Sequence, residues 1–281
     1  MIKLIASDID GTLIDRNNVI PTENLEAIKK IHEKNINFAV CTGKSYSVSK
    51  NICDKLQPTF GIFGNGTQII DLKNNKELIR KILSKEDLLF ITTLVERFKL
   101  HLHIYTDTEI VSEKLMYMDL RNFMLKSKNS SSALNFKIVD NITEYISKNN
   151  PDVFSAVVSS ENSLLDFEKF ITVNKNIMYQ FINKRGKYKD NIICKEYEYI
   201  NISPVHIDKD ESINYLTNYL NISKKEVLAI GDNINDLKMV QNSGIGVAVG
   251  DAYDELKNVA NYVTEKTASE GAFAEAINKF I

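Results

Sequence analysis

The sequence predicts an α/β protein in which a Rossmann-like parallel sheet core is interrupted by an inserted α+β domain. Strand-like and helix-like patterns alternate through the first part of the chain and again after Pro204, which is typical of parallel strands joined by helices. The middle third combines strands and helices without that alternation. We therefore expect a discontinuous core, residues 1–83 and 201–281, around an inserted domain at residues 84–200.

The first third begins the alternation. Apolar runs predict strands at Lys3–Ile9, Asn37–Thr42 and Gly61–Phe63, and amphipathic segments predict helices at Thr22–Glu33 and Ser45–Lys55. The last third repeats the pattern, with helices expected at Glu211–Leu220, Asp236–Asn242 and Ala252–Ala260 and strands at Val227–Ile230, Ile245–Val249 and Tyr262–Thr264.

The segment between these thirds changes character at Thr67–Leu83, which reads as a β-hairpin with Asn74 and Asn75 at its turn. A helix with a broad apolar face is expected to begin near Ser84. Further strands are predicted at Leu100–Tyr105, Phe136–Val139, Val153–Ser159, Ile177–Ile182 and Tyr197–Ile202, with helices near Lys114–Lys126 and Asn162–Val173.

Composition excludes several classes of partner. The 281 residues carry 35 basic and 37 acidic side chains, and no basic cluster indicates binding to nucleic acid or anionic lipid. No apolar run approaches the ~18 residues of a membrane helix. Cys41, Cys53 and Cys194 form no CxxC pair, which favours reduced thiols in a cytoplasmic protein. A small-molecule partner fits best.

Two isolated features have competing interpretations. Cys41, at the end of a predicted strand, could be a catalytic thiol, but burial as a small apolar residue is favoured. His101 and His103 alternate on a predicted strand and could bind a metal together. Because no third ligand lies near them in the sequence, we expect an ordinary exposed strand face.

The stretch Asp8-Ile9-Asp10-Gly11 directly follows an apolar strand. Side chains alternate along a strand, so Asp8 and Asp10 should project to the same side, and Gly11 permits a sharp turn with exposed backbone N–H groups. Paired carboxylates beside free N–H groups suit a metal ion and a phosphate.

A second acidic motif, Gly231 to Asp236, follows the predicted strand Val227–Ile230. Asp232 leaves this strand, and Asp236 follows four residues later, so both can face the sheet edge that carries Asp8. A calcium loop is disfavoured because the spacing lacks the alternating acids and closing Glu of an EF-hand.

Thr42-Gly43 ends another predicted strand, and Lys209 precedes a predicted helix. Each is weak alone, because a Thr-Gly turn or a solvated Lys is common. In their order along the chain, however, DIDGTL, TG, Lys209 and GDNIND resemble the motifs of the haloacid-dehalogenase-like phosphatases. Asn65 and the position of the insertion resemble the Cof-type branch.

The resemblance implies roles for these residues. Asp8 would be the nucleophile that forms an aspartyl-phosphate, and Asp10 the general acid and then the general base. The cofactor Mg²⁺ would bind the Asp8 and Asp232 carboxylates and the Asp10 carbonyl, with support from Asp236. The phosphate would contact Gly11, Thr42, Gly43, Lys209 and Asn235, and further substrate contacts would come from Asn65, Lys44 and Arg185.

Three positions depart from the family pattern. Lys44 stands where Arg commonly follows TG, Gly64 precedes Asn65 where Ser is common, and Asp210 follows Lys209 where Gly is common. Asp210 places a negative charge beside the phosphate Lys and could change phosphate affinity. None of the three removes a chemical group from the expected centre.

The predicted function is that of an Mg²⁺-dependent phosphatase acting on a small phosphorylated metabolite, with sugar phosphates or pyridoxal phosphate as the implied classes. The inserted cap domain would select the substrate, and the protein would be a monomer or weak homodimer. To protonate the leaving group, Asp10 needs a pKa above the ~3.9 of a free Asp, through desolvation or neighbouring negative charge. A phosphosugar mutase and a non-catalytic module that binds phosphorylated ligands are the alternatives.

Overall fold

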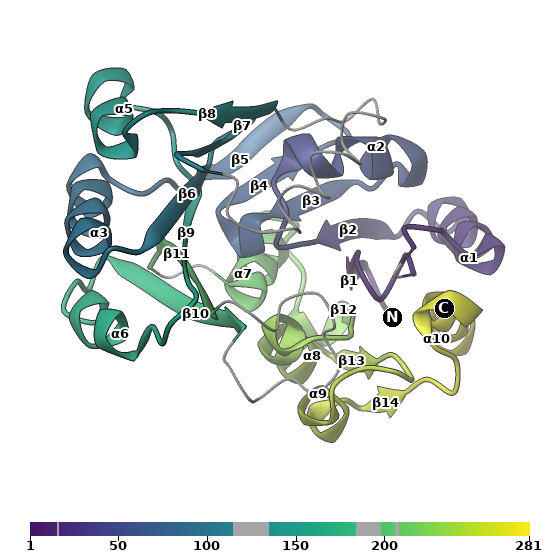
Figure 1. Cartoon of the computed structure of the whole chain (residues 1–281). Coiled ribbons are helices and arrows are strands. Elements are labelled where there is room, and N and C mark those ends of the chain that lie inside the picture. The colour runs from purple at the N-terminus through teal and green to yellow at the C-terminus, as the bar shows by residue number, and fades with distance from the viewer. Residues whose placement is uncertain (16, 115–134, 184–197, 206–207) are drawn as a thin grey trace. The chain divides into compact units, whose positions relative to one another are not determined.

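The computed structural model describes residues 1–15, 17–114, 135–183, 198–205 and 208–281. The chain forms two compact units (Figure 1). The first comprises Met1–Tyr46, Ile52–Arg80 and Ile207–Ile281, and the second comprises Ser47–Asn51 and Lys81–His206. The predicted division into a core at residues 1–83 and 201–281 and an inserted cap domain at residues 84–200 stays a prediction.

The first unit is built on an eight-stranded sheet with the order β14-β13-β12-β1-β2-β3-β4-β5. The strands are β1 (Leu4–Asp8), β2 (Asn37–Cys41), β3 (Phe60–Phe63), β4 (Gln68–Asp71), β5 (Lys76–Arg80), β12 (Val227–Gly231), β13 (Ile245–Ala248) and β14 (Tyr262–Val263). Strands β14 to β3 in this order pair in parallel, whereas β4 and β5 are antiparallel additions. The chain proceeds outward from β1 in one direction and from β12 in the other. The carboxyl ends of β1 and β12 therefore form a topological switch point, where ligands bind in open α/β sheets.

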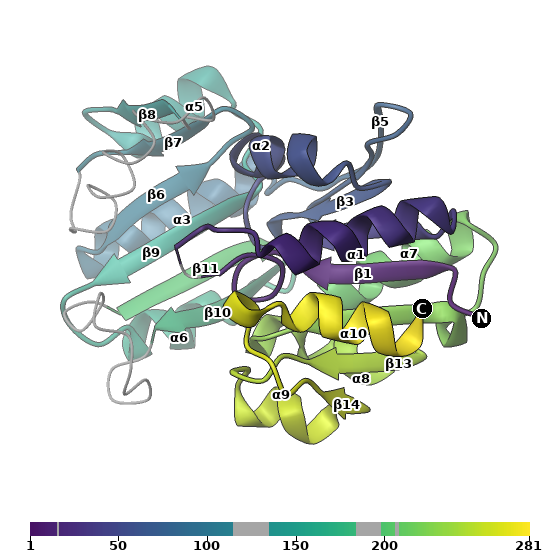
Figure 2. The same ribbon diagram turned by 90° about the vertical axis from the view of Figure 1, so that its right-hand side faces the viewer.

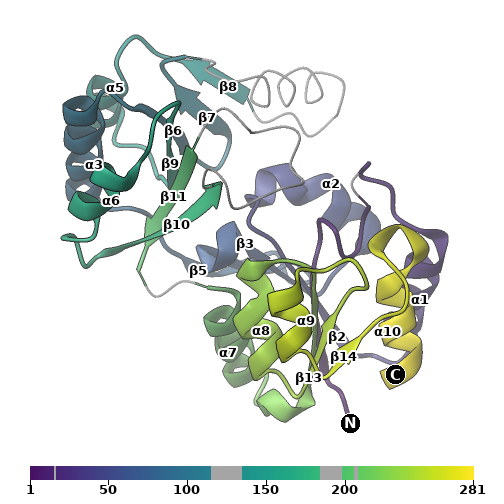
Figure 3. The same ribbon diagram turned by 60° about the horizontal axis from the view of Figure 1, so that its bottom comes forward.

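Helices cover both faces of this sheet. They are α1 (Thr22–Glu33), α2 (Tyr46–Leu56), α7 (Lys209–Tyr219), α8 (Leu237–Asn242), α9 (Asp254–Val259) and α10 (Ala272–Phe280). Figure 2 shows α1 and α10 side by side, and Figure 3 shows α7 and α8 on the opposite side of the strands. Buried apolar side chains from both helix layers form one hydrophobic core with β1 and β12. The strands that end at the switch point are therefore held by close packing.

The second unit has its own six-stranded sheet, with the order β10-β11-β9-β6-β7-β8. Its strands are β6 (His101–Tyr105), β7 (Glu109–Ser112), β8 (Asn135–Ile138), β9 (Ser155–Ser160), β10 (Ile177–Asn183) and β11 (Glu198–Pro204). Neighbouring strands are antiparallel except β7 and β8. The helices α3 (Lys85–Phe98), α5 (Ile142–Asn149) and α6 (Leu165–Ile171) share a separate hydrophobic core with this sheet.

Most elements confirm the sequence-based expectation, including α1 and the β4–β5 hairpin around Asn74 and Asn75. The prediction missed β7, α5 and α10. It also began α6 too early. The N–H of Leu164 donates to the Glu198 carboxylate at 2.7 Å, so this long-range contact supports the start of the helix. The predicted helix at 114–126 lies outside the described residues, apart from Lys114.

The expectation of an exposed strand face at His101 and His103 was wrong. Their exposed fractions are 7% and 1%. Leu102 and Ile104 point to the helix side of β6 and join the core there, so the two imidazoles lie on the opposite face of the sheet and are buried as well. Among the described residues no helix has the length and apolar character needed to cross a membrane.

Candidate active site

The carboxylates of Asp8, Asp232 and Asp236 converge at the switch point of the first unit. Asp8 is the last residue of β1, and Asp232 directly follows β12, the neighbouring strand. One carboxylate oxygen from each of the three side chains lies within 4.8 Å of the others. Acids from the two ends of the chain thus meet at one point, as the motifs predicted. A carboxylate-oxygen donor set of this kind fits a hard divalent cation.

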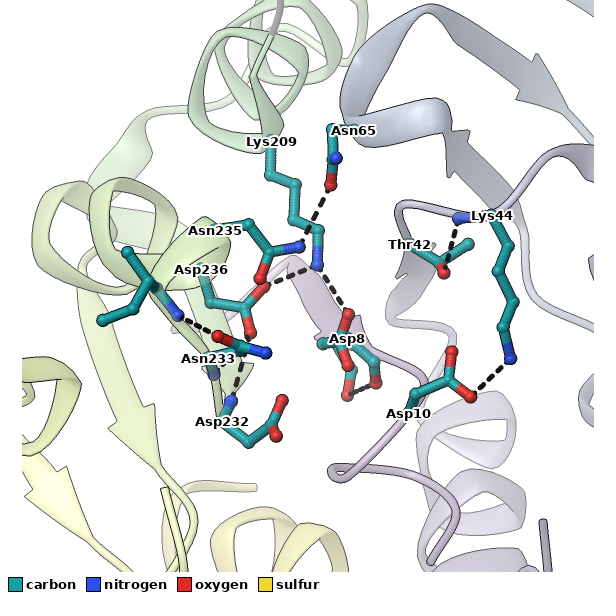
Figure 4. Close-up of polar contacts among 12 residues, drawn as sticks. Asp8, Asp10, Thr42, Lys44, Asn65, Lys209, Asp232, Asn233, Asn235 and Asp236 are labelled. Atoms are coloured by element: carbon teal, nitrogen blue, oxygen red, sulfur yellow. Dashed lines mark hydrogen bonds and ion pairs between the residues drawn. The ribbon is translucent and has the colours of Figure 1, made fainter. Parts of the chain in front are cut away.

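Lys209 supplies a buried positive charge to this cluster (Figure 4). Its ammonium lies 2.5 Å from Asp8 Oδ1 and 2.5 Å from Asp236 Oδ1, and its side chain is 1% exposed. A buried charge of this kind is retained only where it is paired. One ammonium faces three carboxylates, so the cluster carries surplus negative charge.

The pKa shifts of Asp8 and Asp232 follow mainly from burial and secondly from the charges of the cluster. Burial raises the pKa of Asp8 well above its usual range; Lys209 opposes the rise, and Asp236 and Asp232 add to it. The pKa of Asp232 rises to about 7, mainly through burial and then through the charge of Asp236. For Lys209, burial lowers the pKa, but Asp236 and Asp8 outweigh it and the net shift is upward. A bound divalent cation would stabilise both ionised acids.

Asp236 shapes the loop that carries Asp232. Its Oδ2 accepts hydrogen bonds from the backbone N–H groups of Asp232 and Asn233, both at 3.1 Å. The sequence assigned Asp236 a supporting role, and its carboxylate also lies within the cluster itself. Sequence reasoning missed Asp251, whose charge contributes to the raised pKa of Asp232. Its position in Gly250-Asp251, just beyond β13 at the same sheet edge, is the signal that could have indicated it.

Gly11 determines the turn that follows Asp10. Its N–H donates to Ile14 O at 2.9 Å, and the N–H groups of Leu13 and Ile14 donate to Ile9 O, so the expectation that this turn exposes its N–H groups was wrong. Gly11 has φ +81°, and a Cβ there would collide with the Asp232 carboxylate. Glycine is needed for the conformation and for the close approach of Asp232.

Asp10 and Lys44 form an ion pair beside the cluster. Lys44 Nζ lies 2.6 Å from Asp10 Oδ1, and the two side chains are 41% and 42% exposed. Burial does not supply the desolvation that was one of the two expected causes, because this carboxyl group is half-exposed and has an ammonium partner. Lys44 is held in turn near the end of β2, where its N–H donates to Thr42 Oγ1 at 3.1 Å.

Two asparagines link the loops after β3 and β12. Asn235 Nδ2 donates to Asn65 Oδ1 at 3.1 Å, and Asn65 adopts φ 55° within the short turn Gly64–Gly66. A Cβ at Gly43 would lie 3.3 Å from the Asn65 side chain, so Gly43 permits this packing. Arg185, the remaining expected substrate contact, lies outside the described residues.

Cys41 fits the interpretation as a buried apolar residue. It is fully buried, and burial, with a smaller opposing effect from Lys209, raises its pKa to about 12. A thiol with this pKa is not ionised near neutral pH, so it is no nucleophile. Within the described residues, the Asp8–Asp232–Asp236 group is the cluster of potential metal ligands, and the two histidines of β6 do not take part in one.

Comparisons with known proteins identify the family of this chain. The family model of the haloacid dehalogenase-like hydrolases matches residues 5–277. The 5-amino-6-(5-phospho-D-ribitylamino)uracil phosphatase YcsE of Bacillus subtilis is 26% identical over 293 residues, covering 100% of this chain and 96% of the relative.

Solved structures show the same fold. A haloacid dehalogenase-like hydrolase from Bacteroides thetaiotaomicron superposes with a TM-score of 0.81 at 24% identity, covering 100% of both chains. The subclass IIB sugar phosphatase BT4131 superposes with a TM-score of 0.75 at 19% identity, covering 99% of this chain and 98% of that one.

An acidic cluster with a buried lysine lies at the switch point of a Rossmann-like sheet, where α/β proteins bind their ligands. The chain belongs to the haloacid dehalogenase-like hydrolase family.

Proposed function

We propose that this hydrolase is an Mg²⁺-dependent phosphatase that transfers the phosphoryl group of a small phosphorylated metabolite to Asp8 and then to water. The observation that carries the proposal is the convergence of Asp8, Asp232 and Asp236 within 4.8 Å, with Lys209 paired to two of them. Two relatives that are named as phosphatases match this chain along nearly their whole length, which supports the proposal.

Mg²⁺ would be held by the carboxylates of Asp8 and Asp232 and the backbone carbonyl of Asp10, with Asp236 supporting the shell. The donor set fits because every proposed ligand atom is oxygen, and because the cluster contains more negative charge than Lys209 offsets. When bound, the ion would neutralise charge on the phosphoryl oxygens.

In the first half-reaction the Asp8 carboxylate attacks phosphorus. The bond between phosphorus and the ester oxygen breaks, and the leaving oxygen takes a proton from the Asp10 carboxyl group. Lys209 orients Asp8 through its bond to Oδ1, so the other carboxylate oxygen is the attacking atom. Phosphoryl transfer depends mainly on positioning and charge neutralisation, so a carboxylate suffices as nucleophile.

In the second half-reaction Asp10, now a carboxylate, takes a proton from a water molecule. The water oxygen attacks phosphorus, and the bond between phosphorus and Asp8 breaks to release inorganic phosphate. Lys44 pairs with Oδ1 of Asp10 at 2.6 Å, so Oδ2 is the oxygen that would give a proton to the leaving group and take one from water. Thr42, Gly43, Lys209 and Asn235 would hold the phosphoryl oxygens.

The proposed substrates are phosphorylated sugars and polyols, with pyridoxal phosphate as a further class to test. One relative is named for a phosphoribityl compound and one structural neighbour for sugar phosphates, which supports this range. Lys44 and Asn65 in the first unit are proposed to contact the part of the substrate beyond the phosphate.

The test is phosphate release from a panel of sugar phosphates, polyol phosphates, nucleotides and pyridoxal phosphate, with Mg²⁺ and with EDTA. We expect release that requires Mg²⁺ and is lost in Asp8→Asn. Isomerised sugar phosphate without free phosphate would indicate a mutase instead. No release from any compound would favour a non-catalytic binding module.

A further inference from the structure

Asp210 follows Lys209 directly and lies in the first turn of α7. Its side chain is 11% exposed and is directed to partners outside the carboxylate cluster. Oδ1 lies 2.7 Å from Lys224 Nζ, and Oδ2 accepts a hydrogen bond from Asn242 Nδ2 at 2.9 Å. The negative charge beside Lys209 is therefore offset by Lys224 and does not face the phosphate site.

The two partners of Asp210 belong to elements on either side of the second acidic motif. Lys224 lies in the 3-10 turn Lys224–Glu226 that leads into β12, the strand that precedes Asp232. Asn242 is the last residue of α8, the helix that follows Asp236. One carboxylate thus links the helix that carries Lys209 to both elements that frame Asp232 and Asp236.

Asp208, on the other side of Lys209, adds a second link. Its Oδ1 accepts from the Glu211 N–H at 2.8 Å as the helix cap, and its Oδ2 lies 2.8 Å from Lys238 Nζ in α8. Lys238 is 67% exposed, however, whereas Lys224 is 28% exposed. Exposed ion pairs hold geometry weakly, so the contacts of Asp210 are the stronger restraint.

The position of Lys209 needs such a restraint. Its ammonium lies 2.5 Å from both Asp8 and Asp236, and its side chain is 1% exposed. A catalytic group misplaced by ~1 Å can lose ~100-fold in rate. The first turn of α7 therefore has to be fixed against β12 and α8, and Asp210 makes both contacts.

We propose that Asp210 is a positioning residue, which fixes the start of α7 through Lys224 and Asn242 so that Lys209 reaches Asp8 and Asp236. The kinetic consequence rests on the proposed phosphatase function, while the placement of Lys209 does not.

The test compares Asp210→Ala, Asp210→Asn and Lys224→Met in the full chain. The matched control is Asp166→Ala, which removes an exposed Asp–Lys pair at 2.8 Å in α6. The first readout is the rate at which acetic anhydride modifies Lys209 in the free enzyme, measured by peptide mass spectrometry and normalised to Lys3. The second is kcat and KM for the best substrate, well below the unfolding temperature.

In Asp210→Ala we expect Lys209 to be modified at least ~5-fold faster, and kcat to fall ~10-fold while KM changes less than ~3-fold. Lys224→Met and Asp210→Asn should show smaller changes in the same direction. Adding Lys224→Met to Asp210→Ala should change little further, because both act through one contact. Asp166→Ala should match the wild type.

Unchanged Lys209 reactivity with unchanged kcat in all three variants would overturn the proposal. Equally faster modification of the partly buried Lys257 in α9 would show loss of stability instead, and would also overturn it. If Asp210→Ala does not fold, the two milder variants decide the matter. A wild type that releases no phosphate would refute the proposed function, whereas the modification rate of Lys209 would still test its placement.

Discussion

Gly11 shows at the scale of one residue how the acid motif depends on backbone conformation. Its φ of +81° belongs to the left-handed region, and a Cβ would meet the Asp232 carboxylate. We expect Gly11→Ala to lower both the free energy of unfolding, by ~1–2 kcal/mol or more, and the affinity for Mg²⁺. Thermal unfolding and magnesium titration by calorimetry would measure the two effects.

Gly271 provides the control for this prediction. It has φ +88°, and the nearest atom to an added Cβ is Glu23 Cβ at 3.3 Å, far from the acidic cluster in sequence and contacts. Gly271→Ala should therefore lower the unfolding temperature while leaving magnesium affinity unchanged. Equal effects of both substitutions on magnesium affinity would contradict the role assigned to Gly11.

Asp8→Asn separates chemistry from folding. Asparagine has nearly the same shape, and Lys209 keeps its bond to Asp236, so the variant should fold. It cannot form the acyl phosphate, so kcat should fall at least ~1000-fold. Circular dichroism and phosphate release would check the two halves of this expectation, and near-wild-type turnover would refute the assignment of the nucleophile.

Site residues that directly follow a strand could be predicted from the sequence. Site residues whose position depends on a particular tertiary contact could not. Asp8 and Asp232 each follow an apolar strand, so their meeting could be foreseen. The Lys44–Asp10 pair and the bond from Gly11 N–H to Ile14 O depend on side-chain rotamers and turn geometry. No spacing pattern encodes those details.

At the scale of one element, β6 carries two buried imidazoles. Burial lowers the pKa of His103 to about 3, with a smaller effect from His101. Burial, followed by the charge of Lys114, lowers that of His101 to about 4. Both pKa values lie below the usual 6.5. The two histidines are therefore protonated less readily in the folded second unit than in the unfolded chain.

This difference sets the sign of a pH dependence. Between pH 6.5 and about 3 the unfolded state binds more protons at His103, so the stability of the second unit should fall as pH drops through this window. His103→Gln should weaken the dependence, and substitution of the exposed His32 should not. Urea unfolding from pH 7 to pH 4 would measure how the free energy of unfolding depends on pH. Parallel pH profiles for the wild type and His103→Gln would contradict the role of His103.

Elements with strong local periodicity were predictable, and elements supported by distant partners were not. The helix α1 begins after Pro21 and ends where expected, because its apolar spacing is regular. The strand β7 is four residues long and obtains its place from pairing with β6 and β8. A strand this short has little signal in its own sequence, because pairing with neighbouring strands decides whether it forms.

At the scale of the whole molecule, the chain has two hydrophobic cores, one for each compact unit. The candidate metal ligands all belong to the first unit, and the buried histidines belong to the second. Magnesium should therefore stabilise the first unit, whereas protonation of the buried histidines should destabilise the second. Ligand binding stabilises the folded state by ~2.7 kcal/mol when its concentration is 100 times Kd.

Hydrogen exchange measured by mass spectrometry can separate the two effects. Saturating Mg²⁺ should slow exchange in peptides from β1 and β12, because their carboxyl ends carry Asp8 and Asp232, and leave peptides from β6 and β9 unchanged. Lowering the pH from 7 to 5, after correction for intrinsic exchange, should speed exchange in β6 and β9, where protonation of His103 favours opening. Asp232→Asn should abolish the magnesium effect and retain the acid effect. A magnesium response of equal size in both sets of peptides would show that the two cores unfold as one cooperative unit, and would contradict this separation.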